Sequence, residues 1–114
     1  MSRDVLILGW EKRRRVLERL WEVLAELKRA VMELDPSAEV YLFGSAARGA
    51  MRPDSDVDVL VVSDLYGGDL RKIGELLVYI EERVGGVGVL EIHVATREMF
   101  ETWYRKFIDV AISL

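Results

Sequence analysis

The stretch that most constrains the fold is residues 40–63, which combines two short apolar runs with a glycine turn and a polar loop. Residues 40–43 form a β-favouring run that stops at Gly44 and Ser45, a pair that permits a tight turn. After a loop that contains proline and aspartate, residues 56–62 resume as a second strand. We therefore predict two consecutive strands joined by a short helical or looped excursion.

The second predicted strand begins with two carboxylates on one face. Side chains alternate between the faces of a strand, so Asp56 and Asp58 emerge side by side. The rest of the strand is apolar on both faces, which is typical of a central strand with a polar mouth. Two carboxylates so near to each other repel unless a proton or a cation lies between them. Mg²⁺ prefers carboxylate oxygens. The pair is therefore a candidate Mg²⁺ site.

The turn before these acids is a candidate phosphate site. Gly44 allows a close backbone approach, Ser45 offers a hydroxyl, and a helix beginning there would direct free N–H groups at an anion. A phosphate-binding turn opposite a metal-binding carboxylate pair is a layout for phosphoryl or nucleotidyl transfer. Arg48 and Arg52 are near enough in sequence to contact a triphosphate, but each could equally be a surface charge or pair with the acids.

Other interpretations of this stretch fit less well. Residues 54–58 imitate the start of an EF-hand calcium loop, but its required Gly and Glu are replaced by Val59 and Leu65. The glycine spacing imitates a P-loop, but the Lys and Ser/Thr that should follow are Ala50 and Met51. An isolated Asp-x-Asp would be read as solvated turn residues; the upstream Gly-Ser pair disfavours that reading.

The segment before the motif, residues 10–34, has helical periodicity, and Asp35 followed by Pro36 predicts its end. Its apolar stripe is either a core-facing surface or a partner-binding seam. The basic run at residues 12–15 is either a solvated face or a contact for an acidic partner or nucleic acid. The stripe comprises Leu17, Leu20, Leu24, Leu27, Val31 and Leu34.

A second long helix is predicted after the motif. Residues 64–69 contain a Gly-Gly pair and indicate a loop, and Asp69 is a plausible N-cap. Apolar residues then recur at helical spacing until Gly85 and Gly86, which predict the helix end.

A third strand and a final helix follow. Residues 87–95 are β-favouring, with Glu91 and His93 on one face. His93, the single histidine, is expected to form a local hydrogen bond rather than bind metal or act in catalysis. Thr96 can cap a final helix with a broad apolar face: Phe100, Trp103, Tyr104, Phe107, Ile108 and Ala111.

Composition limits the classes of function. We expect residues 1–114 to form one domain, and the net charge of −4 argues against direct nucleic-acid binding. No apolar run approaches the length of a membrane span, so a cytoplasmic location is expected. The chain lacks Cys, which excludes disulfides and thiolate metal sites. It also lacks Asn and Gln, a pattern that weakly favours a thermophilic source.

Gly44-Ser45, ten intervening residues and Asp56-x-Asp58 together resemble the signature of the DNA polymerase β-like nucleotidyltransferase superfamily. The flanking sequences Phe-Gly-Ser-Ala-Ala-Arg-Gly and Ser-Asp-Val-Asp-Val-Leu-Val are similar to its minimal nucleotidyltransferase branch. The predicted element order is α-β-α-β-α-β-α. With the strand directions that the resemblance implies, the expected fold is α/β, a small mixed three-stranded sheet flanked by helices.

The resemblance implies a third carboxylate on the strand after Asp-x-Asp, and Glu91 is the acid at that place. Its implied roles are to complete one metal site and to act as general base toward the attacking hydroxyl. The family more usually has Asp there, and Glu is one methylene longer. An ordinary polar residue on a half-exposed strand is the alternative.

The implied reaction is two-metal nucleotidyl transfer. Asp56 and Asp58 would hold two Mg²⁺ ions about 4 Å apart. Gly44 and Ser45 would bind the β- and γ-phosphates of ATP, and pyrophosphate would leave. The resemblance implies that the acceptor is a tyrosine hydroxyl of a HEPN-domain ribonuclease toxin, which AMPylation silences. The chain would then be the antitoxin of a toxin–antitoxin pair.

An acceptor supplied by a partner is expected, because the sequence offers no second substrate-binding module. An oligomer with the partner or with itself is therefore expected. Candidate contact residues are Trp10, Trp21, Trp103 and Tyr104. Two other functions stay open: a non-catalytic antitoxin that acts by binding alone, and a stand-alone nucleotidyltransferase for small molecules.

Overall fold

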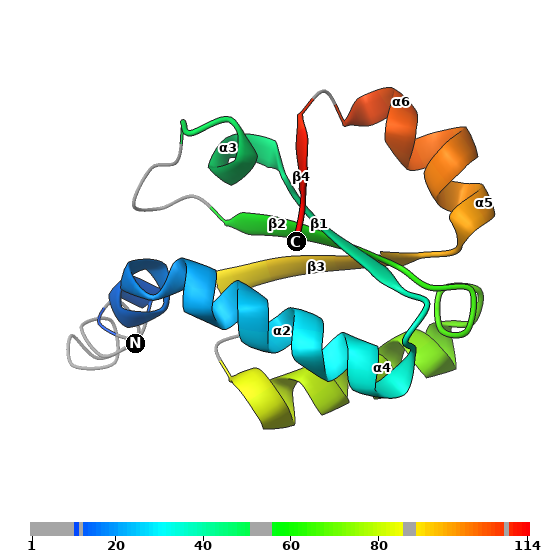
Figure 1. Ribbon diagram of the computed structural model, residues 1–114, viewed down its shortest axis with the longest axis horizontal. Helices are drawn as coiled ribbons and strands as arrows, with labels where there is room; N and C mark the ends of the chain where they lie inside the picture. The colour runs from blue at the N-terminus through cyan, green and yellow to red at the C-terminus, as the bar shows by residue number, and fades with distance from the viewer. Residues whose placement is uncertain (1–10, 12, 51–55, 86–88, 109) are drawn as a thin grey trace, which may run out of the picture.

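The computed structural model describes residues 11, 13–50, 56–85, 89–108 and 110–114. They form an α/β fold in which a mixed four-stranded sheet lies between helices on both faces (Figure 1). The predicted fold class is therefore confirmed, with one strand more than the three expected. No helix in the described part of the chain combines the length and apolarity needed to cross a membrane.

The elements follow the predicted order, except that the strand β4 follows the final helical segment. The helices are α2 Leu20–Leu34, α3 Gly44–Ala47, α4 Leu70–Val84, α5 Arg97–Met99 and α6 Arg105–Phe107, with the π-helical turn η2 Phe100–Tyr104 between α5 and α6. The strands are β1 Glu39–Phe43, β2 Val57–Val62, β3 Leu90–Ala95 and β4 Ala111–Ser113.

The sheet has the order β3-β2-β1-β4. β1 pairs antiparallel with β2 and with β4, whereas β2 and β3 are parallel. In the parallel pair Asp58 lies opposite Glu91 and Leu60 lies opposite His93. The polar residues that begin β2 and β3 therefore share one end and one face of the sheet.

Helices α2 and α4 pack against each other and cover the other face of the sheet (Figure 1). Their apolar stripes enclose the main core with Val57, Val59 and Val61 of β2. The apolar stripe of α2 therefore faces the core, which was one of its two predicted roles. Leu24 and Leu27 are fully buried. Asp69 caps α4 by accepting a hydrogen bond from the Arg71 amide (2.9 Å), and α4 ends before Gly85.

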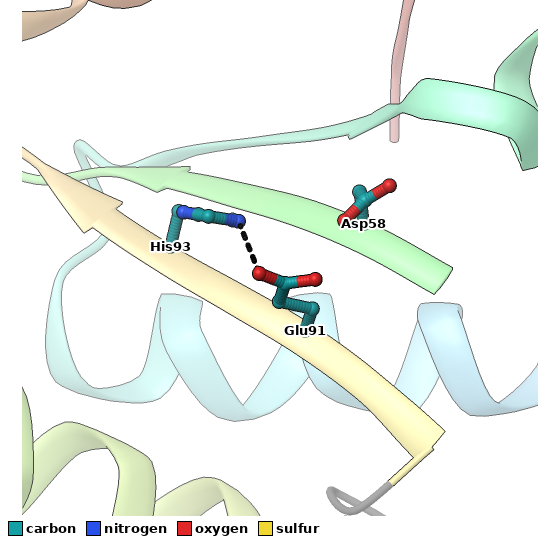
Figure 2. A group of neighbouring side chains, drawn as sticks. All are labelled: Asp58, Glu91 and His93. Carbon is teal, nitrogen blue, oxygen red and sulfur yellow. Dashed lines mark ion pairs between the residues drawn. The ribbon is translucent and has the colours of Figure 1, made fainter. Parts of the chain in front are cut away.

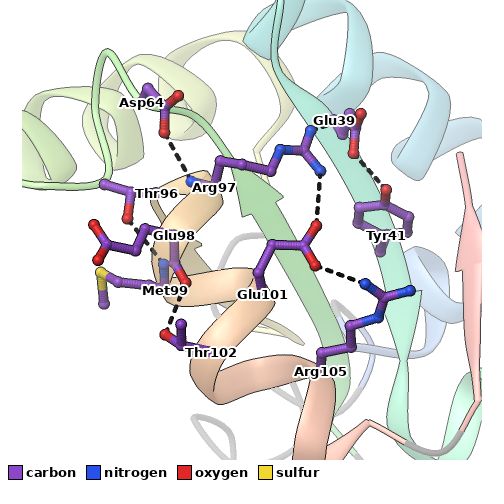
Figure 3. Close-up of polar contacts among 10 residues, drawn as sticks. All are labelled: Glu39, Tyr41, Asp64, Thr96, Arg97, Glu98, Met99, Glu101, Thr102 and Arg105. Carbon is purple, nitrogen blue, oxygen red and sulfur yellow. Dashed lines mark hydrogen bonds and ion pairs between the residues drawn. The ribbon is translucent and has the colours of Figure 1, made fainter.

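The helical segment 97–107 covers the face that carries Asp58. Phe100 and Tyr104 pack against a smaller core of Leu60, Val62 and Ala95. Polar contacts fix the segment to neighbouring elements (Figure 3): Asp64 accepts a hydrogen bond from the Arg97 amide, and the Arg97 guanidinium pairs with Glu39 of β1 at 2.7 Å. Thr96 caps the segment by accepting from the Met99 amide, as predicted.

Three expectations differ from the structure. Ala111, placed by periodicity in the final helix, belongs to β4, because the helix ends at Phe107 and Ile108 is extended. The first helix is divided by a turn at Arg19, with residues 13–18 helical before it. β3 begins at Leu90, and residues 87 and 88 of the predicted strand lie outside the described residues.

Replacing Gly67 with alanine is expected to destabilise the fold by about 1–3 kcal/mol. A Cβ there would lie 2.5 Å from the Ala95 carbonyl oxygen and 2.5 Å from the Thr96 amide nitrogen, and backbone atoms cannot move aside cheaply. Gly74→Ala in exposed α4 is the matched control, with nothing within 4 Å of its Cβ. It should gain about 0.5–1 kcal/mol. Urea denaturation measures both, and equal midpoints would contradict the packing argument.

Candidate metal and nucleotide site

Three potential metal ligands meet where β2 and β3 run side by side. Asp58 extends from β2, and Glu91 and His93 extend from β3 on the same face (Figure 2). One ligand atom from each residue lies within 4.8 Å of the others. The pairing of Asp58 with Glu91 follows from the parallel register, and His93 joins because it lies two residues after Glu91.

Burial and a neighbouring carboxylate disfavour the ionisation of Asp58. Partial burial raises the pKa of Asp58, and the negative charge of Glu91 raises it further. The nearby His93 acts in the opposite direction on that pKa, and Asp56 adds to the rise. A bound cation would relieve this repulsion. Carboxylate oxygens suit Mg²⁺, so Asp58 and Glu91 fit the metal that the sequence indicated.

Gly44 brings backbone directly against Asp58. Its φ of 72° lies in the left-handed region, and an added Cβ would overlap the Asp58 Oδ2 atom. The predicted helical excursion is present as the single turn α3, which contacts β1 and β2. Ser45 is half-buried within α3, and Arg48 is exposed at its C-terminal end. The structure therefore places the glycine turn beside the acidic group, which consists of Asp58 and Glu91.

Asp56 lies at the entrance to β2 and is paired with a residue that the motif did not indicate. The Arg13 guanidinium lies 3.5 Å from the Asp56 carboxylate. The Arg13 side chain is only 17% exposed, whereas that of Asp56 is 59% exposed. One member of the basic run at residues 12–15 therefore reaches the acidic end of the sheet.

His93 was not expected among the metal-binding candidates. Its Nε2 atom lies 3.5 Å from Glu91 Oε1, and its ring contacts those of Phe43 (centroids 5.4 Å apart) and Tyr104 (6.1 Å). In the sequence, strand alternation placed His93 on the same face as Glu91. It did not predict that His93 would lie close to Asp58. A parallel neighbour cannot be inferred from one strand alone.

The other predicted residues are placed as follows. Arg52 and Trp10 lie outside the described residues. Trp21 and Trp103 are exposed, and Tyr104 is half-buried against His93. The roles assigned to Gly44, Ser45, Arg48, Arg52, Asp56, Asp58 and Glu91 stay predictions.

Known structures share this fold. A crystal structure provisionally described as a nucleotidyltransferase superimposes with a TM-score of 0.65 at 27% identity, covering 80% of this chain and 96% of the other. A second, from Sulfolobus solfataricus and also provisionally described as a nucleotidyltransferase, gives a TM-score of 0.54 at 21% identity over 90% of this chain and 82% of the other. The second likeness concerns the fold alone.

Characterised relatives are similar over part of the chain. Spectinomycin 9-adenylyltransferase of Staphylococcus aureus strain Mu50 is 42% identical over 69 residues, as is that of strain N315. The match covers 56% of this chain and 26% of each relative, so the chain spans about a quarter of their length. A family model described as "Nucleotidyltransferase domain" matches residues 24–111, which include β1 to β3 and the acidic group. The chain therefore belongs to the nucleotidyltransferase domain family.

Proposed function

We propose that this chain transfers AMP from ATP to a hydroxyl group in a Mg²⁺-dependent reaction. The observation that carries the proposal is the Asp58–Glu91 pair, held in register on neighbouring strands directly beside the Gly44 turn. Membership of the nucleotidyltransferase domain family supports the reaction class, and the adenylyltransferase relatives support ATP as the donor.

Each residue has a defined task in this proposal. Asp56, Asp58 and Glu91 would hold two Mg²⁺ ions, which supply Lewis-acid stabilisation of charge on the transferred phosphate. Gly44 and Ser45 would bind the β- and γ-phosphates, and Arg48 and Arg52 would contact the triphosphate. These are the seven predicted site residues in their predicted roles.

The bond changes follow from the proposed donor. Glu91 would accept the proton of the attacking hydroxyl. The acceptor oxygen forms a bond to the α-phosphorus of ATP, the bond from that phosphorus to the bridging oxygen of the β-phosphate breaks, and pyrophosphate leaves. In this scheme Asp56, whose Oδ1 atom lies 3.5 Å from the Arg13 guanidinium, would also bind metal.

We further propose that the acceptor is a tyrosine hydroxyl of a HEPN-domain ribonuclease toxin and that the chain is its antitoxin. The motif resemblance supports this acceptor. An exposed acidic end of the sheet would suit a macromolecular acceptor, and Asp56 and Glu91 are both exposed there. Trp21 and Trp103, 61% and 62% exposed, are candidate partner contacts.

A small-molecule acceptor is the second candidate. The 42% identity to spectinomycin adenylyltransferases favours it, although that similarity covers only about a quarter of the relatives' length. A third candidate is an antitoxin that neutralises its partner by binding alone, with the acidic group as a remnant.

Label transfer from ATP radiolabelled on the α-phosphate separates these three functions. Purified chain with Mg²⁺ is incubated with source-organism lysate, with spectinomycin, or with neither. A labelled protein whose label is linked to tyrosine is expected, and the Asp56→Ala/Asp58→Ala double variant should give none. Labelled spectinomycin would overturn the protein acceptor, and no label on any acceptor would overturn catalysis. ATP labelled on the γ-phosphate is the control against kinase activity, since it should leave the acceptor unlabelled.

A further inference from the structure

We propose that His93 is a metal ligand together with Asp58 and Glu91, and that this position prefers a first-row transition-metal dication to Mg²⁺. The inference deepens the proposed function, on which it rests for the place of the metal. It replaces the expected all-carboxylate Mg²⁺ site at one metal position with a site that has both nitrogen and oxygen donors.

The donor atoms of His93 and Glu91 are spaced as ligands of one ion. Metal–nitrogen and metal–oxygen bonds of about 2.0–2.1 Å at tetrahedral angles place neighbouring donor atoms about 3.3 Å apart. His93 Nε2 and Glu91 Oε1 are 3.5 Å apart, and the ligand atoms of all three residues lie within 4.8 Å of one another. Figure 2 shows the imidazole nitrogen and the Glu91 carboxylate facing each other, with Asp58 across from them on β2.

The imidazole is held in place by its neighbours. Phe43 and Tyr104 contact its ring from β1 and from the segment 97–107, and the His93 side chain is 32% exposed. Packing of this kind limits the orientations of the ring while leaving the edge with Nε2 directed at Glu91. A ligand that is oriented before the metal binds loses less conformational entropy on binding.

The donor chemistry selects the metal. Mg²⁺ prefers oxygen donors and retains several water molecules, whereas imidazole suits zinc, copper, iron and nickel. Affinity for a given nitrogen and oxygen site also rises from Mn²⁺ toward Zn²⁺ and Cu²⁺. A site with one imidazole and two carboxylates is therefore expected to bind Mn²⁺ or Zn²⁺ more tightly than Mg²⁺.

His93 could instead act as a positioning residue that holds Glu91 through the 3.5 Å contact. The two roles predict different metal dependence. Loss of a nitrogen ligand weakens Mn²⁺ binding much more than Mg²⁺ binding, because Mg²⁺ gains little from imidazole. Loss of a positioning contact weakens the binding of both metals to a similar extent.

Mn²⁺ binding to the full chain, followed by electron paramagnetic resonance with Mg²⁺ as competitor, tests the proposal. His93→Phe keeps a ring next to Phe43 and Tyr104 but removes the nitrogen, and His93→Ala is the second variant. We expect Mn²⁺ affinity to fall about 10- to 100-fold and Mg²⁺ affinity to change less than about threefold. Unchanged Mn²⁺ affinity, or an equal loss for both metals, would overturn the ligand role. Tyr104→Phe, which keeps the ring packing and the imidazole, should retain wild-type affinity.

The single histidine permits a direct measurement of ligation. On addition of Zn²⁺, a diamagnetic probe, the ¹⁵N resonance of His93 Nε2 should shift strongly while that of Nδ1 moves little. A resonance that stays in place at saturating Zn²⁺ would overturn the proposal even if a variant fails to fold. Neither binding measurement contains ATP or an acceptor, so their outcome is independent of whether AMP transfer is found.

Discussion

Asp58→Asn is expected to reduce nucleotidyl transfer by about 10²- to 10⁴-fold while leaving the protein folded. Asparagine keeps the size and shape of the side chain next to Gly44 and opposite Glu91, but it removes the negative charge. Without that charge, the Asp58–Glu91 pair holds a divalent cation less tightly, and that cation would stabilise the charge that develops on the transferred phosphate. The loss should therefore appear in catalysis and metal binding rather than in folding.

The same substitution is expected to stabilise the protein in the presence of a chelator at neutral pH. Burial and the charge of Glu91 raise the pKa of Asp58 above its unfolded value, so the ionised carboxylate opposes folding. That penalty is absent when the pH is below the pKa of Asp58 in the unfolded chain. It grows as the pH rises through the pKa of Asp58 in the folded protein. Relief of two like charges facing each other across strands is worth a few tenths to about 1 kcal/mol. The advantage of the variant should disappear in acid.

Transfer rates and chemical denaturation at several pH values check both effects. Glu98→Gln, which neutralises an exposed carboxylate on α5 outside the acidic group, is the control and should alter neither. Transfer at the wild-type rate by Asp58→Asn would contradict the proposed role of the pair. Loss of activity accompanied by lower stability in chelator would instead indicate a structural role for Asp58.

Much of the site was predictable because strand periodicity is a local property. Asp56 and Asp58 were placed on one face of β2, and Glu91 and His93 on one face of β3, from alternation alone. The apolar run of β2 correctly indicated a central strand, with Val57, Val59 and Val61 in the main core and Leu60 and Val62 in the second. Gly44 was predicted to allow a close backbone approach to a phosphate, whereas its close approach to Asp58 was not predicted.

The features that were missed depend on contacts between distant segments. Strand β4 has three residues, too few to show the alternation of apolar and polar side chains that predicts a strand. It forms because Ala111–Ser113 pairs with the edge of β1. Arg13 joins the acidic end through its ion pair with Asp56, a residue distant from it in the sequence. His93 becomes a candidate ligand through the parallel pairing of β3 with β2, which sequence alternation cannot supply.

Gly44→Ala is the second substitution expected to have a large effect, with loss of both stability and transfer. An alanine at a φ of 72° costs about 1–2 kcal/mol of backbone strain, since left-handed conformations are disfavoured for residues with a Cβ. The added methyl would also overlap the Asp58 carboxylate, so the turn or the carboxylate must move. A displacement of about 1 Å in a catalytic group can reduce a rate about 10²-fold.

Gly49→Ala separates the two consequences. Gly49 has nearly the same φ, 69°, but its Cβ would meet nothing within 4 Å. Both variants should therefore lose similar stability from backbone strain, whereas Gly44→Ala alone should lose Mn²⁺ affinity and transfer activity. Denaturation midpoints, metal titration and transfer rates of the two variants, measured side by side, provide the comparison. If both retain transfer, the close approach of Gly44 to Asp58 serves packing only; if both lose it, backbone strain rather than displacement of the carboxylate explains the effect.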